Sequence, residues 1–541
     1  MIKNFTRDLR REFSGYNGKK FSKDLMAGLT VTAVALPLAL AFGVSSDADA
    51  AAGLITAIIA GLIISAFSGA SFQISGPTGA MTAVLITIVS KFGMQGVFVA
   101  CLIAGILLLL FGIFKLGNLV SFIPMPVVTG FTTGIAIIIA LGQIDNFFGT
   151  SSAGESAIAK LLSYGTMGFN VNWYAALIGL LVVLIMVLYP KKWNNYVPSS
   201  LVSIIIAALV SNLAGFDIDV VGEIPRKLFH DTRLDISGVN IDMIKQLISP
   251  GFTIAMLAMI ESLLCGSAAA RMKKEPFNAD QELLAQGIGN ILIPFFGGVP
   301  ATAAIARTSV AIKSGGVTRL TGIIHAVGLL LSMFLLGDLM AKLPLAALAG
   351  VLMVTAWRMN EWETIKYIFS KKFKSAIAQF LITMICTVVF DLTIAIIVGV
   401  AVSFLMFVVK SSKIEINVSK VENEKLKNNI EDVEGTHKDS VVMYITGSVF
   451  FGNIAKLTDA VEQMQDCKEI IFSLRGVSAI DTSGAQSLGE ICENLLERNV
   501  KLSFCGVQPG VKEMLQRAGV VDAVGEHSFY WSVDKALLMN N

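Results

Sequence analysis

Long apolar segments alternate with short polar ones over most of the chain. A helix needs about 20 apolar residues to cross the hydrocarbon core of a bilayer, and such runs recur between residues 24 and 409. They cover residues 24–44, 50–68, 95–113, 119–142, 173–189, 197–215, 250–270, 318–340, 343–357, 373–390 and 392–409. Three broken or shorter segments, 71–90, 282–296 and 300–313, bring the total to about fourteen. The pattern predicts an α-helical polytopic membrane protein.

The loops between these segments predict their orientation. If the N-terminus is cytoplasmic, the loops after even-numbered crossings should carry the lysines and arginines. They do, with Lys115, Lys191, Lys192, Arg271, Lys273, Lys274, Lys313, Arg319, Arg358, Lys371, Lys372, Lys374, Lys410 and Lys413. The loop at 213–249, which mixes basic and acidic residues, is the exception. The first 22 residues lack the apolar run of a signal peptide, so both termini are predicted to be cytoplasmic.

Two of the segments are broken by glycine and proline. ISGPTGAMTAVL, within 71–90, is predicted to be extended as far as proline and helical from Thr78. PFFGGVPATAAIARTSVAIK begins at Pro294 and predicts a half-length helix over Ala301–Lys313. About fourteen helices divide into two inverted halves of seven, in which these two segments are each the third. Paired interruptions of this kind indicate the substrate site of a secondary transporter, although kinked helices of another membrane protein are the alternative.

A helix that begins in mid-membrane directs free N–H groups and the positive end of its dipole into the cavity before it. Because the two halves are inverted, the two helix starts are predicted to face each other. Such an arrangement favours an anion.

Three ionisable residues that lie away from the ends of the predicted spans are candidates for a function. Glu261 lies about 15 Å from the cytoplasmic edge, so it is either a proton or cation site or half of a structural ion pair. Arg307, about six residues into its half-helix, is predicted about 9 Å from the midplane. It could attract the anion, replace a cation or pair with Glu261, and its depth argues against a main role in direct binding. His325 is interpreted as a core histidine with satisfied nitrogens.

Composition excludes several classes of protein. The mean hydropathy is +0.70, and 42 Lys and Arg against 40 Asp and Glu give no net attraction to nucleic acid. The six cysteines are scattered without metal-ligand spacing. The sequence has no phosphate-binding GKS/T motif and supplies no nucleophile with a base, so ATP-driven pumping and catalysis have no support. We therefore expect neither an enzyme nor a metal or cofactor.

A soluble domain is predicted after the membrane part. Residues 1–22 are assigned to a cytoplasmic N-terminal segment, 23–413 to the membrane part, 414–436 to a linker and 437–541 to a small cytoplasmic α/β domain. In the last, three apolar strands alternate with helical stretches, which is typical of a sheet flanked by helices. IDTSGAQSL places Asp481, Thr482 and Ser483 where a strand gives way to a helix. A hydroxyl there could accept a regulatory phosphate, with Ser483 as the candidate, but an ordinary helix cap is the favoured interpretation.

These motifs resemble the SulP family of anion permeases. The matching segments are DLMAGLTVTAVALPLALAFGV, ISGPTGAMTAVL, GIGNILIPFFGGVPATAAIARTSVAIKSGGVTR and PLAALAGVL, and YITGSVFFGN with IDTSGAQSL resembles the STAS domain. The resemblance implies the uracil-transporter fold, with seven helices and seven inverted ones, a core domain that moves against a gate domain, homodimers, and an anion between the half-helix starts. Transferred onto this sequence, the substrate-binding residues would be Pro37, Leu38, Phe42, Thr78, Glu261, Ala304, Ile305 and Arg307.

Two departures from the family pattern concern the coupling ion. Many members have glutamine where this chain has Leu38. A sodium-coupled bicarbonate transporter of the family has oxygen ligands where this chain has Cys265, Ile305 and Arg307. A hard cation such as Na⁺ prefers oxygen to sulfur or methylene groups, so Glu261 is better suited to a proton.

The combined interpretation is a secondary transporter of small anions in the plasma (inner) membrane, with sulfate first and a proton coupled through Glu261. Bicarbonate or a dicarboxylate is the alternative substrate. A passive anion channel or exchanger is an alternative mechanism. The alternative of another class is a regulatory scaffold whose STAS domain binds a cytoplasmic protein partner.

Overall fold

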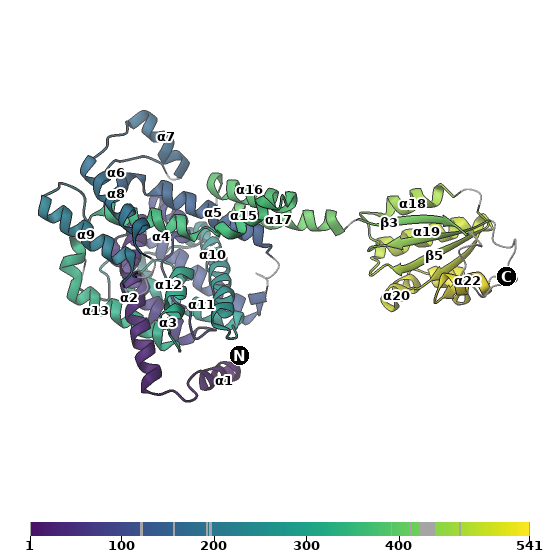
Figure 1. Ribbon diagram of the computed structural model, residues 1–541, viewed down its shortest axis with the longest axis horizontal. Helices are drawn as coiled ribbons and strands as arrows, with labels where there is room; N and C mark the ends of the chain where they lie inside the picture. Colours follow the sequence, from purple (N-terminus) through teal and green to yellow (C-terminus); the bar gives the residue numbers. More distant parts are fainter. Residues whose placement is uncertain are drawn as a thin grey trace. The chain divides into compact units, whose positions relative to one another are not determined.

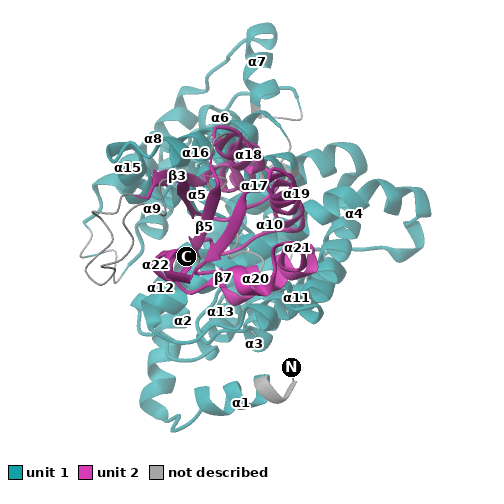
Figure 2. Cartoon of the chain, turned by 90° about the vertical axis from the view of Figure 1, so that its right-hand side faces the viewer, with its two compact units in different colours: residues 1–401 teal, residues 402–541 magenta. Residues whose placement is uncertain are grey.

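The structure is a computed structural model of the chain, and it describes residues 2–118, 123–154, 157–190, 193, 197–224, 226–390, 392–411, 413–421, 439–464 and 467–539 (Figure 1). The chain forms two compact units, residues 1–401 and 402–541 (Figure 2). Each unit is described by itself below.

The first unit is built from helices and two short strands, β1 (Ser75–Gly76) and β2 (Thr302–Ala303). Its helices are α1 (Ile2–Glu12), α2 (Gly18–Ser45), α3 (Ala50–Phe67), α4 (Gly79–Ile113), α5 (Met125–Gly142), α6 (Ile144–Phe148), α7 (Ala157–Met167), α8 (Trp173–Leu188), α9 (Ser199–Ala214), α10 (Ile241–Lys273), α11 (Ala279–Phe296), α12 (Ile305–Lys313), α13 (Leu320–Ala341), α14 (Leu345–Met359), α15 (Trp362–Ser370), α16 (Lys374–Val389) and α17 (Leu392–Ser411), which continues into the second unit.

The predicted helical membrane architecture is confirmed at this level. Six helical segments among the described residues are long and apolar enough to cross a membrane, and five shorter apolar helices accompany them. Helix α4 contains Gly93 in a left-handed conformation, with φ 64°, and is therefore two helices joined at a kink. The outer faces carry large apolar side chains such as Leu213, 84% exposed, and Leu335, 76% exposed, as contact with lipid requires. The number of spans remains a prediction.

Two groups of helices pack within the first unit. Helices α2, α3, α4, α10, α11, α12 and α13 contact one another around the two strands, whereas α5, α8, α9, α14 and α16 form a second group. Small residues allow backbones to approach closely. A Cβ atom on Gly105 of α4 would lie 2.7 Å from the backbone nitrogen of Ile291 in α11, and one on Gly130 of α5 would lie 2.5 Å from the carbonyl oxygen of Phe380 in α16.

One half-helix begins later than predicted. Residues 301–304 are extended, and α12 starts at Ile305, not at Ala301. The sequence ATAAIAR has high helix propensity, but pairing of Thr302–Ala303 with β1 overrides it. The first broken segment agrees with the prediction, because Thr78 is the N-cap of α4.

Contacts between loops show which loops share an end of the unit. At one end, Glu12 binds Arg319, the Asn278 amide donates to the Gly69 carbonyl, and Asp280 accepts from the Gly117 amide. At the opposite end, His230 binds Asp49 at 3.0 Å, and Gln95 Nε2 donates to the Arg233 carbonyl. This grouping agrees with the alternation that the basic residues predict.

The ion pair between His230 and Asp49 should make the second of these ends sensitive to pH. The hydrogen bond to Asp49 raises the pKa of His230 above 6.5, although burial opposes it. Burial alone would raise the pKa of Asp49, but hydrogen bonds from His230 and the Ala52 amide lower it overall. A raised histidine pKa stabilises the fold below the unfolded value and loses that contribution as the pH rises through the folded value. We expect the apparent melting temperature of the wild type to fall, relative to that of His230→Asn, as the pH rises from about 6.5.

Asp49, the partner of His230, supplies the control for this prediction. Because the pKa of Asp49 is lowered, its contribution disappears only as the pH falls through that lowered value. Because Asp49 raises the pKa of His230, Asp49→Asn should also remove the fall in melting temperature above a pH of about 6.5. Parallel pH curves for the wild type and both variants would contradict the prediction.

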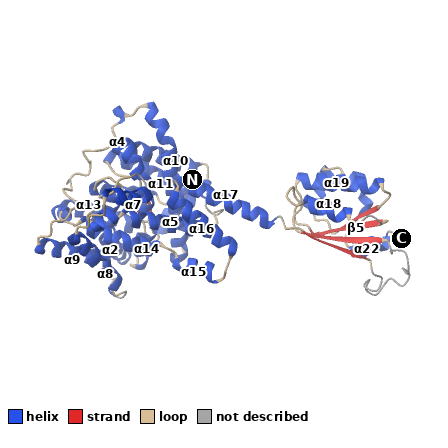
Figure 3. Ribbon diagram, turned by 90° about the horizontal axis from the view of Figure 1, so that it is seen from above, coloured by secondary structure: helices blue, strands red, loops and turns tan. Residues whose placement is uncertain are grey.

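The second unit is a five-stranded sheet between helices, as the predicted α/β domain requires. Its strands are β3 (Glu415–Lys420), β4 (Ser440–Thr446), β5 (Glu469–Gly476), β6 (Lys501–Cys505) and β7 (Phe529–Tyr530), in that order across the sheet, and only the β3–β4 pair is antiparallel. The helices are α18 (Ile454–Glu462), α19 (Thr482–Glu497), α20 (Pro509–Arg517), α21 (Val520–Val524) and α22 (Val533–Met539). Residues of α18 to α21 pack on one face, and α22 packs on the other (Figure 3).

Part of the predicted linker belongs to this sheet. Residues 415–420, predicted as linker, form β3 and pair along their whole length with β4. The strand lies at the sheet edge with five of its six residues exposed, so it lacks the buried apolar run that identified the central strands. Residues 422–436 of the predicted linker, and residues 437 and 438 of the predicted α/β domain, lie outside the described residues.

Candidate functional site

The two broken segments meet through their strands. Ser75 pairs with Ala303, and Gly76 pairs with Thr302, in an antiparallel register. Helix α4 begins three residues after β1, and α12 begins two residues after β2. Because the strands are antiparallel, the two helices leave the crossing in opposite directions, with their N-termini toward it. Neither N-cap residue, Thr78 or Ala304, caps its helix through a side chain, so the first amides keep their capacity to bind an anion.

Side chains from neighbouring helices hold these short strands. Asn290 of α11 takes the place of a third strand, since its amide donates to the Ala301 carbonyl at 2.9 Å and its oxygen accepts from the Ala301 amide at 2.8 Å. Ser262 Oγ of α10 accepts from the Ala303 amide at 3.1 Å and forms a hydrogen bond with Thr302 Oγ1 at 2.8 Å, in which either hydroxyl can donate. Gln286 Nε2 donates to Ser75 Oγ at 2.9 Å. The backbone groups of Ala301 and the amide of Ala303 are thereby paired, as burial demands.

Sequence reasoning missed this supporting layer. Glu282, Gln286 and Asn290 are fully buried and follow one another at intervals of four along α11, so they form one polar stripe. Glu282 accepts from Ser68 Oγ at 2.5 Å and from the Gly69 amide at 3.0 Å. The signal was present as QELLAQGIGN, in which polar residues recur at helical spacing within an apolar segment.

Replacing Asn290 with leucine should destabilise the first unit. The Ala301 N–H and C=O would both stay buried without a partner, at about 1–3 kcal/mol each. We expect the apparent melting temperature in detergent to fall by several degrees. Gln281→Leu is the control, because Gln281 lies on the same helix but its bond to the Phe67 carbonyl is exposed. An equal effect of the two substitutions would refute the supporting role of Asn290.

Arg307 lies at the crossing itself. Its side chain is 1% exposed, Nη2 donates to the Pro77 carbonyl at 2.5 Å, and Nη1 has no hydrogen-bond partner. The predicted position, about six residues into the half-helix, was wrong. Since α12 begins at Ile305, Arg307 is its third residue, and helix side chains point toward the N-terminus. A Cβ atom on Gly76 would lie 2.4 Å from Nη1, so the glycine makes room for the guanidinium.

Glu261 faces the start of the other helix. Thr78 Oγ1 donates to Glu261 Oε2 at 2.9 Å, which joins the N-cap of α4 to α10. One turn later in α10, Cys265 Sγ donates to Thr308 Oγ1 at 3.5 Å. The structure therefore brings Thr78, Glu261 and Arg307 together around the crossing. The described residues contain no cluster of three His, Cys, Asp or Glu that could hold a metal ion.

The remaining predicted residues flank this centre to different degrees. Phe42 is 7% exposed and lies against the first turn of α4, because a Cβ atom on Gly79 would be 3.1 Å from its Cε1. The same position would be 2.2 Å from Cδ1 of Ile139 in α5, a residue that sequence reasoning missed. Pro37 and Leu38 are buried within α2, which packs against α12.

At the start of α12, Ala304 is half-buried and Ile305 is 51% exposed. The apolar side chain at the first helical position is therefore accessible, unlike that of Arg307 two residues later.

His325 differs from its predicted state. It is fully buried, but neither ring nitrogen has a hydrogen-bond partner. The interpretation as a satisfied core histidine is therefore wrong. Its backbone carbonyl accepts a hydrogen bond from the Thr32 hydroxyl at 3.2 Å.

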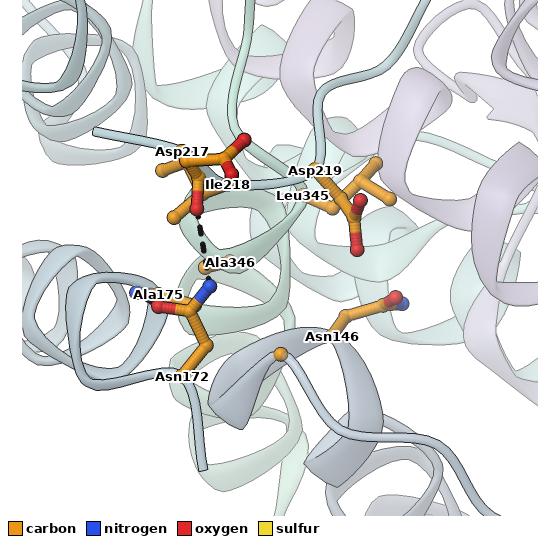
Figure 4. A pocket seen from close by; sticks show the side chains of 9 residues that line it. Asn146, Asn172, Ala175, Asp217, Ile218, Asp219, Leu345 and Ala346 are labelled. Atoms are coloured by element: carbon orange, nitrogen blue, oxygen red, sulfur yellow. Dashed lines mark hydrogen bonds between the residues drawn. The ribbon is translucent and has the colours of Figure 1, made fainter. Parts of the chain in front are cut away.

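A cavity of about 210 Å³ lies elsewhere in the first unit (Figure 4). Its lining includes Asn146, Asn172, Asp217 and Asp219, and Asn172 Nδ2 donates to the Asp217 carbonyl at 3.1 Å. None of the predicted anion-site residues lines it. Two carboxylates at its wall would repel an anion, so this cavity is not a rival substrate site.

In the second unit, Asp481 is the N-cap of α19. It accepts from the Gly484 amide at 2.7 Å and from the Phe451 amide at 3.2 Å, so the capping interpretation is confirmed for this residue. Ser483 is exposed in the first turn of the helix. Its phosphorylation remains a prediction.

Comparison with known proteins agrees with both units. Residues 21–386 match the sulfate permease family, and residues 430–536 match the STAS domain. A Bacillus subtilis protein named "Putative sulfate transporter YvdB" is 35% identical over 537 residues, which are 96% of this chain and 97% of that protein. A Synechocystis protein named "Bicarbonate transporter BicA" is 28% identical over 529 residues, which are 95% of this chain and 93% of that protein.

Solved structures resemble the chain as well. The transmembrane domain of a cyanobacterium bicarbonate transporter, BicA, superposes with a TM-score of 0.64 at 30% identity and covers 72% of this chain and 98% of its own. The structure of SLC26A9 superposes with a TM-score of 0.82 at 17% identity and covers 97% of this chain and 91% of its own. At 17% identity, the similarity to SLC26A9 shows a shared fold.

Proposed function

The chain belongs to the sulfate permease family and carries a STAS domain, and from this premise we propose that it is a secondary active transporter with sulfate as its main substrate. Its family is one of anion transporters, which points away from an enzyme. We place it in the plasma (inner) membrane with both termini in the cytoplasm. Bicarbonate is the alternative substrate, because relatives named bicarbonate transporters cover nearly the whole chain.

One observation carries the proposal. Arg307 is a fully buried cation whose Nη1 has no partner, and it lies where two helix N-termini without side-chain caps converge. Burying a charged group is costly unless its hydrogen-bonding atoms are all satisfied, and Nη1 is not. An anion held at the crossing would accept the Nη1 hydrogen bond and the free amides together, and each of these interactions strengthens away from water.

Glu261 supports coupling to a proton. A carboxylate beside an anion site repels the anion when it is charged, and it shares its Thr78 contact with the start of α4. Protonation removes the repulsion, so proton and anion bind together. Cys265, which donates to Thr308, and the guanidinium of Arg307 offer no oxygen ligands to sodium.

Two features support alternating access. The antiparallel crossing of β1 and β2 sends α4 and α12 in opposite directions, as an inverted repeat requires. The helices around the crossing form one packed group, and α5 and α14 belong to the other. Movement of the first group against the second would expose the crossing to each side of the membrane in turn. Homodimers and a cytoplasmic partner of the STAS domain remain predictions.

Uptake of labelled sulfate into liposomes that contain the purified protein tests the proposal. Accumulation should follow an inward proton gradient, and excess unlabelled bicarbonate or succinate should compete weakly. Uptake of bicarbonate without uptake of sulfate would show that bicarbonate is the substrate. Flux that ignores the proton gradient would support a passive channel instead.

A scaffold function requires a second test, and the structure defines its boundary. Removal of the second domain should start near residue 413, because a cut at 437 would leave β3 without β4. A transporter should retain uptake after this truncation, whereas a scaffold would lose its active part.

A further inference from the structure

The N-terminal segment is bound to the loop that follows α12 by an ion pair between Glu12 and Arg319, and this set of contacts is called the clasp. Glu12 accepts three hydrogen bonds from Arg319: from its amide at 2.6 Å, from Nε at 2.9 Å and from Nη2 at 2.7 Å. Both side chains of this ion pair are buried, at 8% and 6% exposed. Arg319 Nη1 also donates to the Ala66 and Ser68 carbonyls at the end of α3. Phe5 of α1 completes the contact, 5.3 Å beneath the Arg319 guanidinium and 6.4 Å from the ring of Phe67.

A second acidic residue strengthens the clasp. Asp24, fully buried near the start of α2, accepts from the Val317 amide at 2.6 Å and from the Thr318 amide at 3.0 Å. The Thr318, Thr321 and Tyr16 hydroxyls also donate to it. The loop between α12 and α13 is therefore fixed by carboxylates on both sides of the α1–α2 turn. Because α12 starts at the strand crossing, α1 is mechanically connected to the candidate anion site.

Glu12 and the apolar residues of this segment face inward, and the outer face of α1 is mainly cationic. Phe5, Leu9 and Glu12 are partly buried, whereas Arg7, Arg10 and Arg11 are exposed. The Arg7 and Arg11 side chains are 75% and 64% exposed, and the acid near them is Asp8, at 4.0 and 3.6 Å. Three arginines against one carboxylate leave this face with a net positive charge.

The depth of α1 follows from α2. Large apolar side chains on the outside of α2 begin with Phe21, 47% exposed, and continue with Met26, 60% exposed, and Leu29, 50% exposed. A membrane-crossing helix turns such residues to lipid, so the hydrocarbon region begins near residue 21. Helix α1 ends only six residues before α2 begins at Gly18 and runs crosswise to it (Figures 1 and 2). It therefore lies at the level of the lipid headgroups.

We propose that the outer face of α1, formed by Arg7, Arg10 and Arg11, binds the headgroups of anionic phospholipids and thereby holds the clasp against the membrane. Arginine forms paired hydrogen bonds with phosphate, and basic residues at an anionic surface add to one another. The lipid stabilises the position of α1. Through the Glu12–Arg319 pair, α1 then stabilises the α12–α13 loop, and this loop keeps the start of α12 at the strand crossing.

The test uses the full chain in detergent with added phosphatidylglycerol, followed by the apparent melting temperature. The wild type should be stabilised. The variant R7Q/R10Q/R11Q, altered only at exposed positions, should need roughly a hundredfold more lipid for the same stabilisation, because each basic residue strengthens binding about fivefold. The control K227Q/K245Q/K342Q removes three cations at the opposite end of the unit and should behave as the wild type.

Each other outcome overturns the proposal. Equal stabilisation of the wild type and R7Q/R10Q/R11Q would exclude α1 as the lipid site. Equal stabilisation by soluble glycerol phosphate would show that the arginines bind free phosphate and not a membrane surface. Because the melting temperature does not depend on transport, a protein that moves no sulfate would count against the proposed function alone.

Discussion

Sulfate uptake should be nearly lost when Arg307 is replaced by glutamine. Glutamine can still donate to the Pro77 carbonyl, so the crossing keeps one of its contacts, but the positive charge and the unpartnered Nη1 donor disappear. Removing one partner of a buried charge pair costs about 2–5 kcal/mol, which corresponds to an affinity lower by roughly 30-fold to several thousandfold. The measurement is the KM for sulfate in liposomes.

Two further variants separate charge from shape. Arg307→Lys keeps the charge without the planar fork, and it should recover part of the lost affinity. Arg358→Gln is the matched control, because Arg358 of α14 also donates to a buried backbone carbonyl, that of Met186, but lies outside the crossing. It should leave the KM within a few-fold of the wild type. An unchanged KM in Arg307→Gln would remove Arg307 from the anion site.

Replacing Glu261 with glutamine should abolish proton-driven accumulation while anion exchange continues. The glutamine oxygen can accept the Thr78 hydroxyl as the carboxylate does, so the start of α4 stays in place. A neutral amide neither repels the anion nor carries a proton. We expect accumulation under a proton gradient to fall at least about tenfold, with sulfate exchange at equal pH changed by only a few-fold.

The control for this variant is the other buried carboxylate of the supporting layer. Glu282→Gln weakens the bonds to Ser68 and Gly69, so it should lower thermal stability but preserve the pH dependence of the remaining uptake. If Glu261→Gln retained the wild-type pH profile, coupling would have to reside in another group.

The sequence was informative wherever a single segment determines the outcome. Apolar runs predicted the helices, glycine and proline marked the two interruptions, and the isolated Glu261 pointed to the site. Contacts between distant segments were not predictable in the same way. Strands β1 and β2 have two residues each, too few to show any alternation. The position of Arg307 followed from their pairing, which delays the start of α12 by four residues.

The errors in polar residues have the same origin. Whether His325 finds a partner depends on side chains from α2 and α3, which pack against α13, and its own helix gives no indication. The sequence did not reveal the role of Asn290, because its partner is the backbone of Ala301, and a backbone partner does not depend on the residue type. Strand β3 was predicted as linker because most of its residues are polar and exposed, as they are in a linker.

The strand crossing also constrains how the protein is made. One strand comes from each half of the chain, and α4 to α11 must be synthesised between them. Until β2 emerges, the backbone of Ser75 and Gly76 lacks its partner, although its neighbours α3 and α4 are apolar enough to enter the bilayer. Unpaired backbone is poorly tolerated in lipid. The first half of the transporter must therefore remain incompletely inserted, or be shielded by the insertion machinery, until the second half arrives to complete it.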